Sequence, residues 1–188
     1  MDRFMSSGML PRCLALLSDS GISLCHSTGA TASGIHGFRH PAEISLHDLA
    51  FTVVYHGDNR YGMLVLPADR IVEFWAALDF GQVRKLMGLR QIRMASELEL
   101  TTLFPDCDIG AVPPFGNFFD MPVLLEQDLA MTQFITFTIG TPRDVVRMNT
   151  ADFQVLVKPV VGSFSARLNP SRGLRARKMN AWNSASVA

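Results

Sequence analysis

The stretch best suited to chemistry runs from Phe104 to Asn117 and reads FPDCDIGAVPPFGN. Pro113 and Pro114 lock their own φ angles and supply no N–H group, whereas Gly110 permits a positive φ and a close approach of the backbone to a ligand. A stiff loop with a few inward amides can polarise a carbonyl, as an oxyanion hole does. The alternative is a rigid helix-to-strand connection that binds nothing. The amide donors available in the loop are those of Gly110, Ala111, Val112, Phe115 and Gly116.

Histidines offer a weaker pattern. His36 and His40 have the i, i+4 spacing of zinc-binding helices, but Gly37 lies between them and Pro41 follows, so a helix there would be poor. A metal site and solvated loop histidines are both open readings of this segment. We favour the second and expect no metal and no cofactor.

The cysteines predict neither a disulfide framework nor a zinc ribbon, because Cys13, Cys25 and Cys107 are odd in number and irregularly spaced. Cys25 and His26 are adjacent on an expected strand, so their side chains would point to opposite faces and could not form a catalytic pair. Cys107 lies between two aspartates, which would raise the pKa of its thiol and argue against a nucleophile. A reducing cytoplasm is the expected location.

The elements that position the loop follow from local signals. Ser96 and Glu99 form a capping box that starts a helix running to about Phe104, before Pro105. Two β-branched runs separated by Gly57-Asp58-Asn59 predict a hairpin. Helices and strands alternate irregularly, which favours a mixed sheet with helices packed on it. The expected strands are at 22–27, 49–56, 60–67, 122–126, 134–140 and 144–149. The other expected helices are at 9–17, within 70–88 and at 151–157. The second of these helices should break near Gly81 and Gly88, and the third should follow a cap at Asn149 or Thr150.

Composition is that of one soluble globular domain: 188 residues, 48% hydrophobic and 18% charged. The sequence contains no run of 18 apolar residues, so we expect no membrane span. The N-terminus lacks the pattern of a signal peptide. The charges balance at 17 basic and 17 acidic residues, but five basic residues and no acid follow residue 166. The body of the chain is therefore mildly acidic, and the tail is basic and expected to be disordered.

The segment ASELELTTLFPDCDIGAVPPFGNFFDMPVLLEQDLA resembles the signature of the YbaK/ProX-type aminoacyl-tRNA deacylases, free-standing relatives of the editing domain of bacterial prolyl-tRNA synthetases. The likeness continues in YGMLVLPADRIVEF upstream and ITFTIGTPRDVVRMNTADFQVLVKP downstream. It implies a single α/β domain with a curved mixed β-sheet and peripheral helices. The expected organisation is an N-terminal helix over residues 1–20, an editing domain over 21–165 and a basic tail over 166–188.

The resemblance also implies an activity. Family members hydrolyse the ester that joins a wrong amino acid to tRNA, with water as the nucleophile, assisted by a ribose hydroxyl of the terminal adenosine. Gly110 to Pro114 match the family's Gly-x-x-x-Pro loop, in which the amides of Gly110, Ala111 and Val112 would hold the aminoacyl carbonyl. Gly140 would close the pocket. The implied substrate-binding residues are Thr52, Pro113, Pro114, Phe115, Gly116, Thr138, Gly140 and His26.

Two departures from the family pattern put the activity in question. The family's catalytic and tRNA-positioning lysine lies in an Ala-Lys-Thr segment, which here reads Ala50-Phe51-Thr52. Phenylalanine cannot pair with a phosphate or steady an oxyanion, a loss that costs about 2–4 kcal/mol of transition-state stabilisation. Close relatives often read Gly-Thr-His after the later strand, where this chain has Pro142 in place of the histidine.

The leading hypothesis is therefore trans-editing, the hydrolysis of mischarged aminoacyl-tRNA by a cytoplasmic monomer or homodimer with no DNA or membrane partner. The second hypothesis is a catalytically silent module that binds an aminoacyl group, a free amino acid or a partner protein. The intact loop favours the first, and Phe51 and Pro142 favour the second. The basic tail either touches tRNA phosphates or is a solvated terminus.

Overall fold

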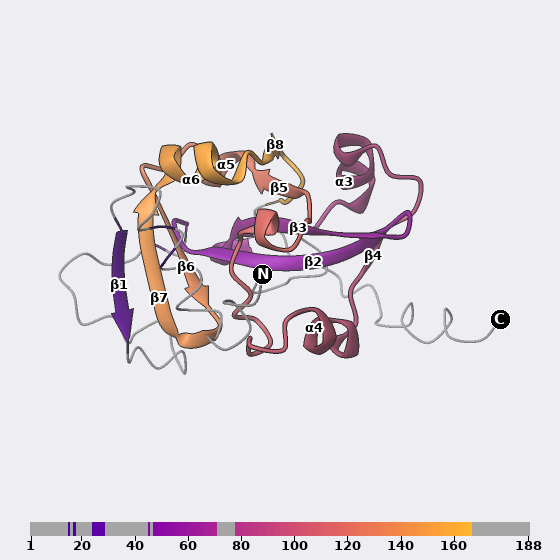
Figure 1. Ribbon diagram of the computed structural model, residues 1–188. Coiled ribbons are helices and arrows are strands. Elements are labelled where there is room, and N and C mark those ends of the chain that lie inside the picture. The colour runs from indigo at the N-terminus through magenta and orange to yellow at the C-terminus, as the bar shows by residue number, and fades with distance from the viewer. Residues whose placement is uncertain are drawn as a thin grey trace, which may run out of the picture.

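The computed structural model describes residues 24–28, 47–70 and 78–166, together with Ala15, Leu17 and Ser45. Strands and helices alternate irregularly along the chain (Figure 1). The strands are β1 (Leu24–Thr28), β2 (Ala50–Gly57), β3 (Arg60–Pro67), β4 (Arg93–Met94), β5 (Val123–Glu126), β6 (Phe134–Ile139), β7 (Thr141–Asn149) and β8 (Val160–Gly162). The helices are η1 (Ala68–Arg70), α3 (Phe80–Met87), α4 (Glu97–Leu103), η2 (Gly116–Phe118), α5 (Gln127–Ala130) and α6 (Thr150–Val157). Within the described residues no helix is long and apolar enough to cross a membrane.

The strands form two hydrogen-bonded sheets. One has the order β4-β2-β3-β5-β8, with parallel pairing of β3 to β5 and of β5 to β8, and the other is the antiparallel sheet β1-β7-β6. The sheets meet where Leu49, just before β2, forms a parallel bridge with Thr136 of β6. There the Thr136 N–H donates to the Asp48 carbonyl oxygen at 2.9 Å. The predicted mixed α/β fold is confirmed, and the long-range bridge adds a junction that no local pattern indicated.

The β2–β3 hairpin was predicted and is confirmed. Its turn residues Asp58 and Asn59 have φ angles of 46° and 66°, the left-handed values that a tight hairpin turn needs and that these residue types tolerate. The Asp58 carboxylate accepts the N–H groups of Arg90 and Gln91 at 2.9 and 3.0 Å. These two bonds lower the pKa of Asp58 and tie the turn to the segment before β4.

Helix ends follow the expected capping chemistry. The Ser96–Glu99 capping box is present at the start of α4, and the Asn149 side chain caps α6 by accepting the Ala151 N–H at 2.9 Å. The predicted break near Gly81 is confirmed to within two residues, because α3 begins at Phe80 after the Asp79 cap and Gly81 lies in its first turn. The predicted break near Gly88 is also confirmed, because the helix ends at this glycine, which has a φ of 65°. For the expected helix at 9–17, the described residues Ala15 and Leu17 are helical.

Alternating apolar residues bury both faces of the five-stranded sheet. One face packs against β6, β7 and α6, and the other against α3 and the segment around Phe164. The first core includes Ala50, Val54, Met63, Val65, Phe115, Ile135, Phe137, Val146 and Phe153, and the second includes Val53, Tyr55, Leu64, Leu66, Val83 and Phe164. Strands buried on both faces read as apolar runs, as the sequence of β3 does.

A buried ionic cluster fastens the last described segment to the sheet. Arg70 is 4% exposed, pairs with Asp128, and donates to the carbonyl and the Oγ of Ser165. Glu126 is 1% exposed, and its Oε2 accepts the N–H groups of Phe164 and Ser165 at 3.0 and 2.8 Å. Removing one partner of such a cluster would leave a buried charge uncompensated, so we assign it a structural role.

Candidate active site

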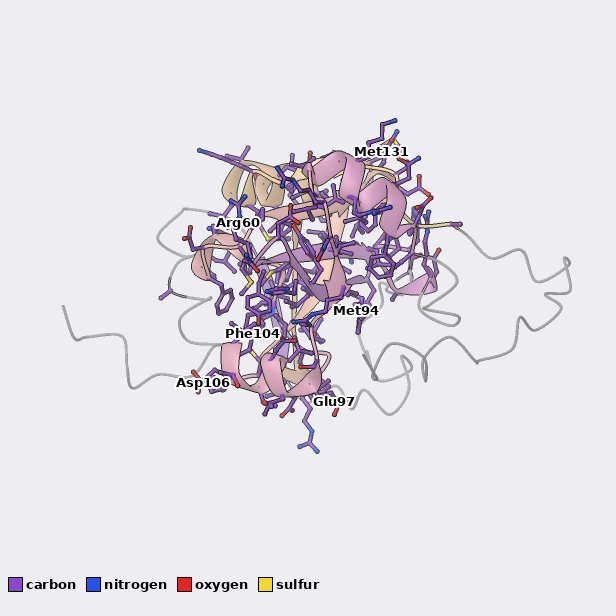
Figure 2. The ribbon with its side chains drawn as sticks, turned by 90° about the vertical axis from the view of Figure 1, so that its right-hand side faces the viewer. Arg60, Met94, Glu97, Phe104, Asp106 and Met131 are labelled. Atoms are coloured by element: carbon purple, nitrogen blue, oxygen red, sulfur yellow. The ribbon has the colours of Figure 1, made fainter. Side chains whose placement is uncertain are left out.

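The FPDCDIGAVPPFGN loop is anchored by aromatic side chains at both ends. Phe104, which ends α4, is 1% exposed, and Phe115 is fully buried. The Phe115 ring lies 5.2 Å from Phe137 and 6.0 Å from Phe153, measured between centroids. Figure 2 shows the α4 end of the molecule, marked by Phe104, far from Met131 at the opposite end. The loop therefore starts and finishes in the core and has little freedom between its ends.

Gly140 pins the middle of the loop. The Asp108 N–H donates to the Gly140 carbonyl at 2.7 Å, and the Gly140 N–H donates to the Ala111 carbonyl at 2.9 Å. Gly110 and Gly140 have φ angles of 87° and 72°, which residues with a Cβ adopt only with strain. The structure thus brings Gly140 against the loop through two backbone hydrogen bonds, at backbone angles that favour glycine at both positions.

The three predicted amide donors are not equivalent. The Ala111 N–H donates to the Asp108 carbonyl at 2.9 Å, so this donor is used within the loop and is not available to a substrate. Within the described residues, the N–H groups of Gly110 and Val112 have no hydrogen-bond acceptor. Val112 is only 6% exposed. Two unpaired amides on a rigid loop are the feature expected of a carbonyl-binding site.

Phe51, at the position of the family lysine, lies beside this loop. A Cβ added to Gly110 would stand 3.8 Å from Cε2 of Phe51, which is ordinary van der Waals contact. The ring is half-buried and packs against the core that contains Val53 and Tyr55. The structure therefore places the Phe51 ring beside Gly110, at the position where the resemblance implies a lysine.

The Leu49–Thr136 bridge decides which side chains share a face with Phe51. Bridge partners point to the same side of a sheet and side chains alternate along a strand, so Phe51, Thr136 and Thr138 all lie on one face. Thr52 lies on the opposite face, with the core residues of β2. By this alternation Thr138 shares the face of Phe51 and Thr52 does not, and the assignment of both threonines to one pocket stays a prediction.

The other predicted substrate-binding residues of the loop support it from within. Pro113, Pro114, Phe115 and Gly116 are all buried. The Gly116 carbonyl accepts the N–H groups of Phe119 and Met121 at 2.9 Å. Such contacts hold the loop's shape. His26 lies on β1 opposite Val146, and its side chain is outside the described part of the structure, as is the His36–His40 segment.

Cys107 is an inert thiol by its surroundings. Burial, with smaller contributions from the charges of Asp106 and Asp108, raises the pKa of the Cys107 thiol from 9.0 to about 11, which confirms the predicted direction. Because the thiolate is the reactive form, we expect iodoacetamide to label Cys107 at pH 8 about 100-fold more slowly than an ordinary cysteine, a factor of ten per pKa unit. Peptide-resolved mass spectrometry would measure this, with the denatured chain as control. Equal rates in the folded and denatured chains would contradict it.

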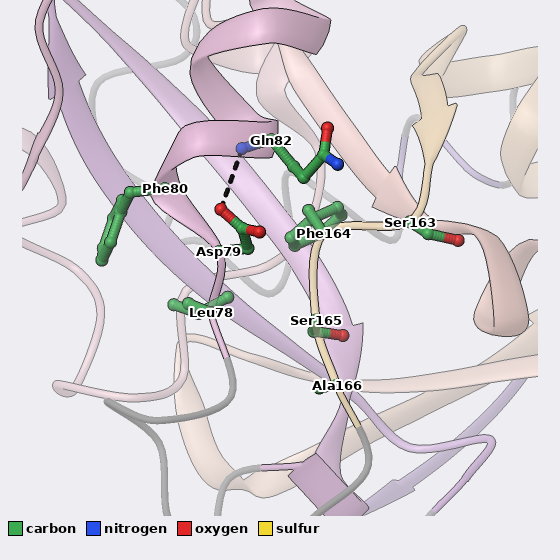
Figure 3. Close-up of a pocket in the computed structure, with 8 residues that line it drawn as sticks. All are labelled: Leu78, Asp79, Phe80, Gln82, Ser163, Phe164, Ser165 and Ala166. Atoms are coloured by element: carbon green, nitrogen blue, oxygen red, sulfur yellow. Dashed lines mark hydrogen bonds between the residues drawn. The ribbon is translucent and has the colours of Figure 1, made fainter.

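A separate hollow lies between the start of α3 and residues 163–166 (Figure 3). Its volume is about 530 Å³, and its polar lining includes Asp79, Gln82 and Ser163. The Asp79 carboxylate already accepts the Gln82 N–H at 3.0 Å, and Ser163 donates to Gln127 at 3.1 Å. With the Asp79 carboxylate used as a helix cap and the Ser163 hydroxyl bonded to Gln127, this hollow offers little for chemistry. In the described part of the chain, no three acidic, histidine or cysteine side chains cluster as metal ligands.

One pair of residues near the site was missed by the sequence analysis. Arg147 of β7 is the cross-strand partner of Thr136 on β6, on the face that carries Phe51 and Thr138. The alternation in FITFTIG, with threonine at every second position, signals a polar face on that strand. The pairing partner on β7 could be found only from the register of the two strands.

Comparison with known proteins agrees with this geometry. The model of the aminoacyl-tRNA editing domain matches residues 29–156. A solved structure described as a candidate trans-editing enzyme for prolyl tRNA synthetase shares 20% identity and a TM-score of 0.67, over 83% of this chain and 96% of that one. The hypothetical protein APE2540 shares 14% identity and a TM-score of 0.68, over 82% and 99%. A search of curated proteins finds no match. Because these sequence identities are 20% or lower, the structural likeness establishes the fold and nothing about function.

The family match spans more than half of the chain. The chain belongs to the aminoacyl-tRNA editing domain family. The resemblance drawn from its residues is thereby confirmed, and the family assigns the chain an aminoacyl-tRNA editing role.

Proposed function

We propose that this protein hydrolyses the ester bond between an amino acid and tRNA, acting on mischarged species. The observation that carries the proposal is that the amides of Gly110 and Val112, on a loop pinned by Gly140, have no acceptor among the described residues. These donors would bind the carbonyl oxygen of the ester and gain strength as negative charge develops on it during attack by water. Because the loop is rigid before the substrate arrives, little reorganisation accompanies the reaction.

Phe51 limits the rate in this scheme. Its ring stands beside Gly110, where a cation would stabilise the oxyanion, and an aromatic ring offers no such charge. The same observation supports the second candidate, a module that binds an aminoacyl group without hydrolysing it. The two candidates share the loop and differ in whether the two amides alone accelerate hydrolysis.

The deciding measurement is amino-acid release from a panel of correctly and wrongly charged tRNAs. We expect the wild-type protein to accelerate release from at least one mischarged species above the spontaneous rate. Gly110→Ala should lower that rate, because a residue with a Cβ at a φ of 87° is strained and shifts the amide. Gly88→Ala is the matched control, since its φ is 65° and it lies at the end of α3. No acceleration on any charged tRNA would leave only the binding role.

A further inference from the structure

Arg147 and Thr136 are a polar pair on the face of β6 and β7 opposite the core residues Ile135 and Phe137. Thr136 is fully buried, and in the part of the chain that the structure describes neither its Oγ1 nor the buried Nε of Arg147 has a hydrogen-bond partner. The two residues face each other across β6 and β7. Most buried polar groups in native proteins are hydrogen-bonded, so two neighbouring groups without a partner among the described residues mark a place where a ligand can supply one.

The charge of Arg147 is also available. Its guanidinium carbon lies 4.4 Å from the centroid of the Phe134 ring, a stacking contact that holds the planar group in place without neutralising it. Among the ion pairs formed by the described residues, none involves Arg147. A planar, stacked and unpaired guanidinium matches the geometry of a phosphate, which it can contact through two parallel N–H groups.

The position of the pair links it to the candidate active site. Thr138 pairs with Val145, two residues before Arg147 on β7. Arg147 is therefore a diagonal neighbour of Thr138, at a Cα separation of about 7–8 Å that a long side chain can bridge. Through the Leu49–Thr136 bridge this face continues to Phe51.

We propose that Arg147 binds a backbone phosphate of the single-stranded RNA end that carries the ester, and thus positions the substrate. The Thr136 hydroxyl is the neighbouring group that can hold the Arg147 Nε–H when the guanidinium turns to the phosphate. The inference rests on the proposed function, because the ligand is the RNA part of the same substrate. In this proposal Arg147 on β7 provides the positive charge for the substrate that Phe51 on β2 cannot provide.

The test measures binding, so it is independent of hydrolysis. The probe is a hairpin RNA with an unpaired CCA 3′ end, and its affinity is measured over a series of salt concentrations. For Arg147→Gln we expect about ten-fold weaker binding, the loss of one charge-assisted hydrogen bond, and a salt dependence (log Kd against log salt) shallower by about 0.7. Arg147→Lys should keep the salt dependence. Arg84→Gln removes the same charge from the exposed face of α3 and should change neither quantity.

A second variant separates binding from folding. Thr136→Val replaces a hydroxyl that has no partner among the described residues, so the melting temperature should not fall, while RNA binding should weaken. The inference would be overturned if Arg147→Gln bound the hairpin with the affinity and salt dependence of the wild type. It would also be overturned if Arg147→Gln bound more weakly with an unchanged salt dependence, or if the wild type did not bind the hairpin at all. Release of amino acids by the wild type would uphold the proposed function in each of these cases. Loss of RNA binding in Arg147→Gln would uphold the inference even if no release occurred.

Discussion

Phe51→Lys should raise the rate of amino-acid release from mischarged tRNA by about 30- to 1000-fold, which corresponds to about 2–4 kcal/mol of transition-state stabilisation. The reason is positional. The Phe51 ring lies in van der Waals contact with the position that a Gly110 Cβ would occupy, so a lysine there would bring an ammonium group near the amides that we propose bind the carbonyl. Single-turnover release from the species that the wild type prefers, or from the whole panel, measures the gain.

Phe51→Met is the matched control for this gain. Both variants remove the ring from its half-buried contacts with the Val53 and Tyr55 core, and each should lose about 1–2 kcal/mol of stability from apolar area returned to water. Only the lysine adds charge. Equal rates in the two variants, with both folded, would show that a missing cation is not what limits hydrolysis. A silent wild type with an active Phe51→Lys would identify a binding module that keeps a competent pocket.

Gly116→Ala should destabilise the protein by about 3 kcal/mol or more, at the upper end of overpacking effects. A Cβ at Gly116 would lie 2.3 Å from the Met121 carbonyl oxygen and 2.5 Å from Cγ2 of Val123. The Gly116 carbonyl also accepts the N–H groups of Phe119 and Met121, so the backbone cannot move away without breaking these bonds. The melting temperature should fall by roughly 6–12 °C, and release of amino acids should fall with the loop's order.

Gly88→Ala distinguishes a clash from ordinary glycine strain. Gly88 has a φ of 65° and nothing within 4 Å of an added Cβ, so it should cost only the left-handed strain of about 1–2 kcal/mol. Calorimetry or thermal circular dichroism on both variants compares the two costs. Equal losses of stability would mean that the Met121 backbone yields, and that the loop is softer than its contacts indicate.

Local chemistry in the sequence determined most of the elements and the stiffness of the loop. The Ser96–Glu99 capping box, the Asp58-Asn59 turn and the paired prolines act over a few residues, through short hydrogen bonds and steric limits on φ. Such signals can be read without a fold, and the structure has the capping box and the turn where they were expected. The direction of the Cys107 pKa shift was predictable for the same reason, because its neighbouring aspartates are adjacent in sequence.

Tertiary structure decided which of these parts meet and which donors stay free. Gly140 lies thirty residues from Gly110 in the chain, and only the packed fold shows that it pins the loop while Ala111 bonds to Asp108. The Leu49–Thr136 bridge joins the two sheets, and this single long-range contact places Thr138 and Arg147 on the face of Phe51 and leaves Thr52 on the other. Strand order and register are set by the sum of distant contacts in the core, so the sequence could nominate candidate site residues, and only the fold could show which of them lie together.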